Sequence, residues 1–264
     1  MLDFDSNQDL LESQMAYKIV NCLTRKYPYP HGQIDNFLPN ELLDKLLENW
    51  PDSDEFISNA QSGSILRSDG KDVVKKETAY DFRNQIALTE KEEIERIKGK
   101  KLEVWRFFTK LLTSSKLISA FIRLYASPLM SRFNLKSSGD LFEKVKYSPR
   151  IHLIHDKTNY ALGPHTDNQG KVIVILVYFE SDVLSDDKNH FGTAVYIPRE
   201  EGFKCETGQH HSHDKFLKVF SADFQKNNAF SFCRSDVSFH GVEKVQEKSV
   251  ERKLLQYSLY GSLK

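Results

Sequence analysis

One short segment has the residue types and the spacing of a metal site. It reads Gly163-Pro164-His165-Thr166-Asp167 and comes just before an apolar run. Residues two apart in an extended chain face the same way, so the His165 imidazole and the Asp167 carboxylate can point at one ion. His240, in the segment Ser238–Val242, can supply a third ligand. Two imidazoles and one carboxylate form a facial donor set that suits Fe(II), so the sequence predicts an iron site.

Such a site would leave three positions of an octahedral ion open. A bidentate 2-oxo acid would fill two of them and dioxygen the third. The distal carboxylate of such a cosubstrate needs a cation inside the pocket. Arg252 follows His240 at the start of an apolar segment, and a guanidinium can hold a carboxylate through two parallel hydrogen bonds. Lys253 is the nearest competitor, but adjacent strand residues face opposite ways.

The second half of the chain has the pattern of a β-sheet domain. β-Branched and aromatic runs alternate there with polar, turn-like clusters, and no helix-length pattern separates them. Strands in this arrangement pair antiparallel, as a sandwich or barrel. The expected strands are Val145–His155, Lys171–Phe179, Thr193–Ile197, Phe216–Phe220, Ala229–Cys233 and Leu254–Tyr260.

The first half has helical periodicity instead. Apolar residues recur at helical spacing in segments that begin near Pro39, Glu90 and Lys116 and end near Trp50, Leu112 and Phe133. The polar stretch Ser53–Lys76 is expected to be a surface loop. We predict one domain over residues 1–264, with a mostly helical layer at 1–143 and a β core at 144–264.

Composition excludes several classes of protein. Lys plus Arg and Asp plus Glu both number 37, whereas nucleic-acid-binding surfaces usually carry a basic excess. The longest strongly apolar run, Val172–Phe179, is too short to span a bilayer. The first residues lack a signal peptide pattern, and the three cysteines, Cys22, Cys205 and Cys233, match no zinc spacing. We therefore expect a cytoplasmic protein that binds neither nucleic acid nor membranes, and the oligomeric state stays open.

The ordered motifs resemble the 2-oxoglutarate- and Fe(II)-dependent oxygenase superfamily. Its signature is His-x-Asp, a distal His, and an Arg or Lys about ten residues later. Within it, Tyr160–Asp167, Gly192–Tyr196 and His240-Gly241-Val242 resemble the prolyl-4-hydroxylase-like branch, as does Asn36-Phe37-Leu38-Pro39 near the start. One departure is Phe191, which stands where the branch usually has a first glycine before Gly192.

The resemblance implies a fold, cofactors and a reaction. The fold would be a double-stranded β-helix, or jelly roll, flanked by N-terminal helices. Fe(II), 2-oxoglutarate and O2 would act together, with succinate and CO2 as co-products and hydroxylation as the common outcome. Tyr160 would contact cosubstrate or substrate, and Arg252 would bind 2-oxoglutarate. Gln256 should share the inward face of the last strand with Arg252 and Leu254. Asp167 disfavours halogenation, because halogenating relatives lack this carboxylate.

The substrate stays open between two classes. Long connections at Glu180–Gly192 and Arg199–Lys215 favour a lidded cavity and a small molecule, such as a sugar or amino-acid derivative. A peptidyl or prolyl hydroxylase acting on a protein is the alternative, and it would need an open groove. A non-catalytic jelly roll that binds a metal or ligand is a third possibility. We interpret His210, His211 and His213 as a solvated loop. His155 either lines the pocket or is a core or edge histidine with a satisfied partner.

Overall fold

The computed structural model describes residues 4–58, 83–157, 160–181, 191–206, 208–243 and 251–264. The helices are α1 (Phe4–Val20), α2 (Asn40–Glu48), α3 (Lys91–Ile94), α4 (Lys100–Leu112), α5 (Ser115–Leu124), α6 (Ala126–Phe133) and α7 (Asp140–Glu143). The strands are β1 (Thr24–Arg25), β2 (His31–Ile34), β3 (Ile57–Ser58), β4 (Arg83–Ala87), β5 (Val145–Asp156), β6 (Leu162–His165), β7 (Lys171–Ser181), β8 (Ala194–Pro198), β9 (Phe216–Ser221), β10 (Ala229–Cys233), β11 (His240–Val242) and β12 (Arg252–Leu263).

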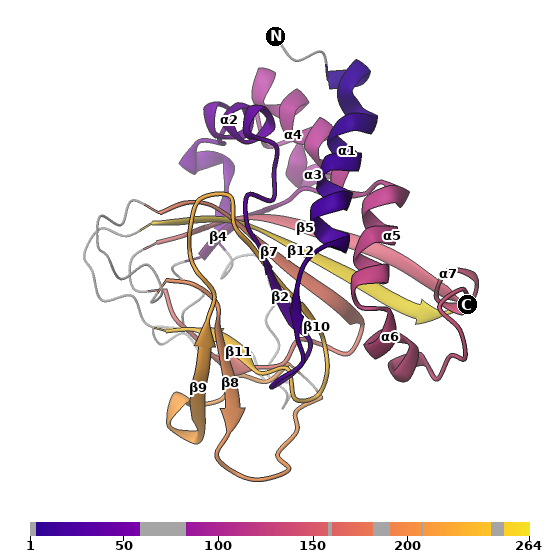
Figure 1. Ribbon diagram of the computed structural model, residues 1–264. Coiled ribbons are helices and arrows are strands. Elements are labelled where there is room, and N and C mark those ends of the chain that lie inside the picture. Colours follow the sequence, from indigo (N-terminus) through magenta and orange to yellow (C-terminus); the bar gives the residue numbers. More distant parts are fainter. Residues whose placement is uncertain (1–3, 59–82, 158–159, 182–190, 207, 244–250) are drawn as a thin grey trace.

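Two antiparallel sheets form the core. The larger has the order β1-β2-β10-β7-β12-β5-β4-β3, and the smaller has the order β6-β11-β8-β9. The four central strands β10-β7-β12-β5 and the four of the smaller sheet are wound so that consecutive strands mostly alternate between sheets. This is the topology of a double-stranded β-helix, so the predicted jelly roll with flanking helices is confirmed (Figure 1).

Strand β7 shows why the core is continuous. Its residues are apolar without interruption from Val172 to Phe179, because both of its faces are buried. Ile173, Ile175 and Val177 belong to the core under the helices. Val174, Leu176 and Tyr178 belong to a second core between the two sheets. We call the side of the larger sheet that faces the smaller sheet its inner face.

The helices cover the other face of the larger sheet, as Figure 1 shows. Trp105 and Phe108 of α4 and Phe121 of α5 are buried there, and Trp105 packs against Phe179 of β7. The expected helix from Glu90 to Leu112 is in fact two helices, because the chain turns at Gly99 with φ 60°. The expected helix from Lys116 to Phe133 likewise breaks at Tyr125, between α5 and α6.

The expected strands of the second half are all present, with ends within three residues of those predicted. The short strands β6 and β11 were not anticipated, and they carry the histidines of the candidate site. The N-terminal region also adds β1–β4 to the larger sheet. Most of the loop expected at Ser53–Lys76, and residues 182–190 of the proposed lid, lie outside the described residues.

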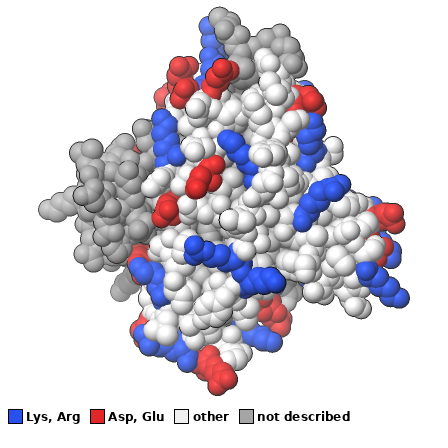
Figure 2. Space-filling model, viewed as in Figure 1, with Lys and Arg blue, Asp and Glu red and all other residues white. Residues whose placement is uncertain are grey.

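The surface agrees with the balanced composition. Acidic and basic side chains are interspersed on the face seen in Figure 2, without a large area of one sign. Among the described residues, no helix has both the length and the apolar character needed to cross a membrane.

Candidate metal centre

The jelly roll brings the three predicted ligands together. His165 ends β6, Asp167 follows it, and His240 begins the adjacent strand β11, where it pairs directly with His165. One ligand atom from each side chain lies within 4.8 Å of the others, and all three residues are buried. The sequence separation between His165 and His240 disappears because β6 and β11 are neighbours in the smaller sheet.

Backbone contacts orient both imidazoles in the same way. The Nδ1 atom of His165 lies 3.0 Å from the carbonyl oxygen of Gly163, and Nδ1 of His240 lies 3.0 Å from that of Ser238. A carbonyl can only accept, so Nδ1 carries the hydrogen in each ring. Nε2 is then left with a lone pair for a metal ion, which is the usual outer-shell arrangement around ligating histidines.

The protonation states also fit a metal ion. Burial lowers the pKa of His165 well below its usual value, and His210 and His240 lower it further. Burial likewise lowers the pKa of His240. Burial raises the pKa of Asp167, but the Lys171 ammonium, His240 and Arg234 together outweigh it, so the pKa lies below its usual value. Two neutral imidazoles and one carboxylate are the forms in which these groups bind a divalent cation.

One carboxylate oxygen of Asp167 has a hydrogen-bond partner, and the other has none among the described residues. Oδ1 accepts a hydrogen bond from the Lys171 ammonium at 2.5 Å. Oδ2 is buried and has no hydrogen-bond partner among the described residues, and it lies 3.5 Å from Nε2 of His240. A buried polar atom without a partner is costly unless a ligand or ion satisfies it. This atom therefore fits a metal ligand.

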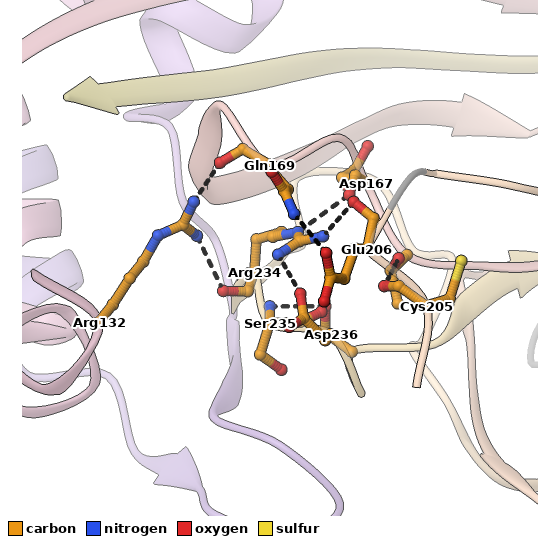
Figure 3. A network of polar contacts seen from close by, with 10 residues as sticks. Arg132, Asp167, Gln169, Cys205, Glu206, Arg234, Ser235 and Asp236 are labelled. Atoms are coloured by element: carbon orange, nitrogen blue, oxygen red, sulfur yellow. Dashed lines mark hydrogen bonds and ion pairs between the residues drawn. The ribbon is translucent and has the colours of Figure 1, made fainter. Parts of the chain in front are cut away.

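A buried arginine that sequence reasoning missed holds the backbone of Asp167. Arg234, just after β10, donates from Nε to the Asp167 carbonyl oxygen at 2.9 Å and from Nη2 to the Glu206 carbonyl oxygen at 2.8 Å. Its Nη1 pairs with Asp236 at 2.5 Å. Figure 3 shows that Arg132 of α6 extends the network, donating to the carbonyl oxygens of Arg234 and Gln169. Arg234 thus ties the turn after His165 to two other segments.

The segment after Glu201 packs on the same turn from the other side. Thr166 Oγ1 donates to the Cys205 carbonyl oxygen at 2.6 Å, and the His211 amide donates to that of Pro164 at 2.9 Å. Gly163 makes this approach possible, because a Cβ there would lie 2.4 Å from the His211 carbonyl oxygen.

The loop that carries three histidines is solvated at His210 and His213, as expected, but it also contacts the metal centre. The ring of His210 stacks on that of His165, with centroids 4.2 Å apart and planes at 17°. His211 packs against Phe203 and Phe216. His210 keeps one side exposed, yet its surroundings lower its pKa to about 4, chiefly through burial and then through His240. It borders the metal centre.

Arg252 lies inside the jelly roll, as predicted, but it has an unexpected partner. Its Nη1 donates to Oδ2 of Asp156 at 2.8 Å, and both residues are buried. Arg83 of β4 donates to both oxygens of the same carboxylate, at 2.6 and 2.8 Å. Nε of Arg252 is buried and has no hydrogen-bond partner among the described residues. Two guanidinium groups thus share one carboxylate.

The neighbours of this cluster separate Arg252 from its competitor. The Lys253 ammonium lies over the ring of Trp50, on the helix side of the sheet. Arg252 lies under the aromatic residues of the interior, 5.0 Å from the centre of the Phe224 ring and 5.9 Å from that of Tyr160. Tyr160 is fully buried and also stacks on Arg83 at 4.2 Å. The structure thus brings Tyr160 and Arg252 together.

Strand alternation determines on which face of the larger sheet Gln256, His152 and His155 lie. Gln256 pairs with Leu176 and with His152, and Leu176 belongs to the core between the sheets. Gln256 and His152 are therefore on the inner face. His155 is not: it pairs with Glu251 at 2.8 Å and packs on Phe56. Of the two alternatives for His155, the histidine with a satisfied partner is therefore confirmed, and His152 is the histidine of β5 on the inner face.

Comparisons with known proteins add a distant likeness. No model of a known protein family matches the chain, and no curated protein does. Among solved structures, the auxin dioxygenase AtDAO1 from Arabidopsis thaliana is 8% identical, with 96% of this chain and 89% of that one covered and a TM-score of 0.47. A prolyl-4-hydroxylase from Pseudomonas putida is 11% identical, with 94% and 98% covered and a TM-score of 0.43.

A third similar structure is an oxidoreductase of the 2OG-Fe(II) oxygenase family from Burkholderia pseudomallei. It is 12% identical, with 94% of this chain and 89% of that one covered and a TM-score of 0.45. All three TM-scores are below 0.5, so the functional inference has to rest on the residues of this chain.

Proposed function

We propose that this protein is an Fe(II)- and 2-oxoglutarate-dependent oxygenase that hydroxylates a small molecule. The observation that supports this most is the convergence of His165, Asp167 and His240, with one unsatisfied carboxylate oxygen between two oriented imidazoles. This donor set suits Fe(II) and leaves coordination positions open for other ligands. Iron bound there with 2-oxoglutarate and O2 would supply the oxidising chemistry, with succinate and CO2 as co-products.

The second support comes from the other end of the interior. Arg252 is a buried cation whose Nε has no hydrogen-bond partner among the described residues, while its Nη1 donates to Asp156. A buried donor of this kind needs an acceptor. The distal carboxylate of 2-oxoglutarate would supply it, so we assign its binding to Arg252, with Tyr160 as a wall of the pocket and Gln256 beside it on the inner face.

The chain's own groups would then have separate tasks. His165, Asp167 and His240 would hold the iron, Lys171 would keep Asp167 ionised, and Arg252 would orient the cosubstrate. The interior around Tyr178, Phe224 and Phe230 is apolar and would exclude water from the reaction.

An anaerobic titration tests the proposal. Fe(II) and then 2-oxoglutarate are added to the metal-free protein while the visible charge-transfer band is followed. The band should appear only with both, and it should be absent in His165→Ala. If well-folded protein binds iron but gives no band with 2-oxoglutarate, the proposal fails and a non-catalytic metal-binding jelly roll takes its place.

A further inference from the structure

The inner face of the larger sheet becomes basic at the end that carries the metal centre. Pairing places Arg150 of β5 opposite Ser258, Ser258 opposite Val174, and Val174 opposite Phe232. The ring of Phe232 lies 4.5 Å from that of His240. Neighbouring strands are about 4.8 Å apart, so the backbone at Arg150 is about 14 Å across the sheet from the strand that contacts His240.

Arg150 faces inward and is accessible. Its neighbour Ile151 is buried in the core under the helices, so Arg150 lies on the opposite face of the strand. Its side chain is exposed, and its guanidinium lies 4.8 Å from the centre of the Tyr260 ring. No carboxylate in the described part of the chain forms an ion pair with it.

The Tyr260 ring connects Arg150 to the metal centre. A Cβ at Gly170 would lie 3.1 Å from this ring, so the ring rests against the turn that follows Asp167. Lys171, the next residue, pairs with Tyr260 across the strands and places its ammonium on Asp167. Half-buried His152 reports the same basic surroundings, because burial and then Lys171 and Arg150 lower its pKa to about 4.

Bound iron would change the charge balance around Lys171. The two charges of Fe(II) would be balanced by Asp167 and by the metal-bound carboxylate of 2-oxoglutarate, so Asp167 would no longer neutralise Lys171 alone. Arg150 has no ion-pair partner among the described residues. The two cations next to the Asp167 turn would then attract a group of the opposite sign.

We propose that the primary substrate carries an anionic group, a carboxylate or a phosphate, that binds Arg150 on its Tyr260 platform with Lys171 beside it. This inference rests on the proposed function, because the charge accounting includes bound iron and 2-oxoglutarate. The guanidinium supplies two parallel donors for such a group, and the aromatic ring beneath it limits its orientation.

Matched small molecules test the proposal on protein loaded with Zn(II), a redox-inert stand-in for iron, and 2-oxoglutarate. Phenylacetate, phenyl phosphate and phenylacetamide are titrated with ligand-observed NMR. At least one anion should bind about 10-fold or more tightly than the amide, as expected for one charge-assisted contact. Arg150→Gln should remove this preference, and Arg150→Lys should keep most of it.

Arg123→Gln is the matched control. Arg123 is also exposed and lies over an aromatic ring, that of Phe142 at 5.7 Å, but it belongs to α5 on the helix side. Its variant should keep the wild-type preference. Equal affinity for anions and amide, or no binding of either anion, would overturn the proposal. So would an anion preference that survives Arg150→Gln, because the anion would then be bound to the metal itself.

Failure of this inference and failure of the proposed function give different results. If the charge-transfer band forms but Arg150→Gln changes nothing, the oxygenase centre stands and the anion site falls. If an anion binds more tightly than the amide only when Arg150 is present, but no band forms, the anion site stands and the oxygenase proposal falls.

Discussion

At the metal end of the interior, Asp167 has one carboxylate oxygen on Lys171 and the other without a partner. In the arginine cluster, which we call the arginine end, Asp156 receives hydrogen bonds on both oxygens from Arg83 and Arg252. Both carboxylates are buried. At Asp167 one buried carboxylate oxygen is thus without a donor or an ion, whereas at Arg252 one buried donor, Nε, is without an acceptor among the described residues. The difference indicates which charge each end is built to receive: a metal ion at Asp167 and a carboxylate at Arg252.

Among the substitutions that test this difference, removal of the Asp167 carboxylate should have the largest effect on activity. Asp167→Ala takes away the only carboxylate among the three candidate ligands and should abolish turnover of 2-oxoglutarate. Consumption of 2-oxoglutarate in air, with and without added iron, measures it. Asp167→Ala is matched by Asp214→Ala, an exposed aspartate in the loop before β9, which should leave consumption unchanged. Substantial turnover in Asp167→Ala would remove this residue from the ligand set.

At the arginine end, loss of Asp156 should destabilise the fold itself. Asp156→Leu would leave two guanidinium groups buried or half-buried without their shared counterion. Breaking a buried ion pair on one side typically costs about 3–5 kcal/mol. Urea unfolding of the metal-free protein measures the change. Added 2-oxoglutarate should recover part of the loss; a variant as stable as the wild type would show that the cluster is solvated.

Arg252→Ala sharpens the assignment of the cosubstrate site. The Kd for 2-oxoglutarate should rise about 30-fold or more, since truncating one partner of a buried charge pair costs about 2–5 kcal/mol. Metal affinity should change little, because Arg252 hydrogen-bonds to Asp156 and to none of the three candidate ligands. Lys253→Ala is the control, with its ammonium over Trp50 on the other face. An effect confined to Lys253→Ala would reverse the assignment.

The metal site and the arginine cluster also differ in how much of each could be predicted from the sequence. The ligands His165, Asp167 and His240 could be predicted because their residue types suit Fe(II) and because the spacing of His165 and Asp167 points both side chains the same way. Arg252 could be predicted because a guanidinium suits a carboxylate, and because strand alternation allows only one of Arg252 and Lys253 to point inward. Asp156 and Arg83 were not, because their contact joins strands β4 and β5 that are distant in sequence.

The absence of a local sequence pattern also explains the other features that the sequence did not predict. Strands β6 and β11 are only four and three residues long, too short for a periodic pattern. Arg234 lies in a turn whose contacts come from two other loops, and nothing local distinguishes it from a surface arginine. The helix breaks at Gly99 and Tyr125 were hidden because apolar spacing continues on both sides of each break.

Arg234 offers a test of how the metal end is held. Arg234→Met removes the hydrogen bond to the Asp167 carbonyl oxygen without touching a ligand side chain. Loss of outer-shell partners typically lowers metal affinity about 10- to 100-fold. Competition with a chelator for Zn(II) measures it. Arg132→Met, which loses hydrogen bonds to the Arg234 and Gln169 carbonyl oxygens but none to Asp167, should have a smaller effect. An equal effect of both variants would mean general loosening of the loop.

The smallest expected effect is that of His210, whose ring contacts the candidate ligand His165 but which is not itself one of the three candidate ligands. Its ring stacks on His165, and such ring pairs contribute about 0.5–1.5 kcal/mol beyond buried area, so His210→Ala should weaken Zn(II) binding only about 2- to 12-fold. His213→Ala on the same loop, with its ring against Tyr196, should have no effect. A loss as severe as that in His165→Ala would show that His210 binds the metal itself, and the centre would then have four protein ligands and one fewer open position for substrate chemistry.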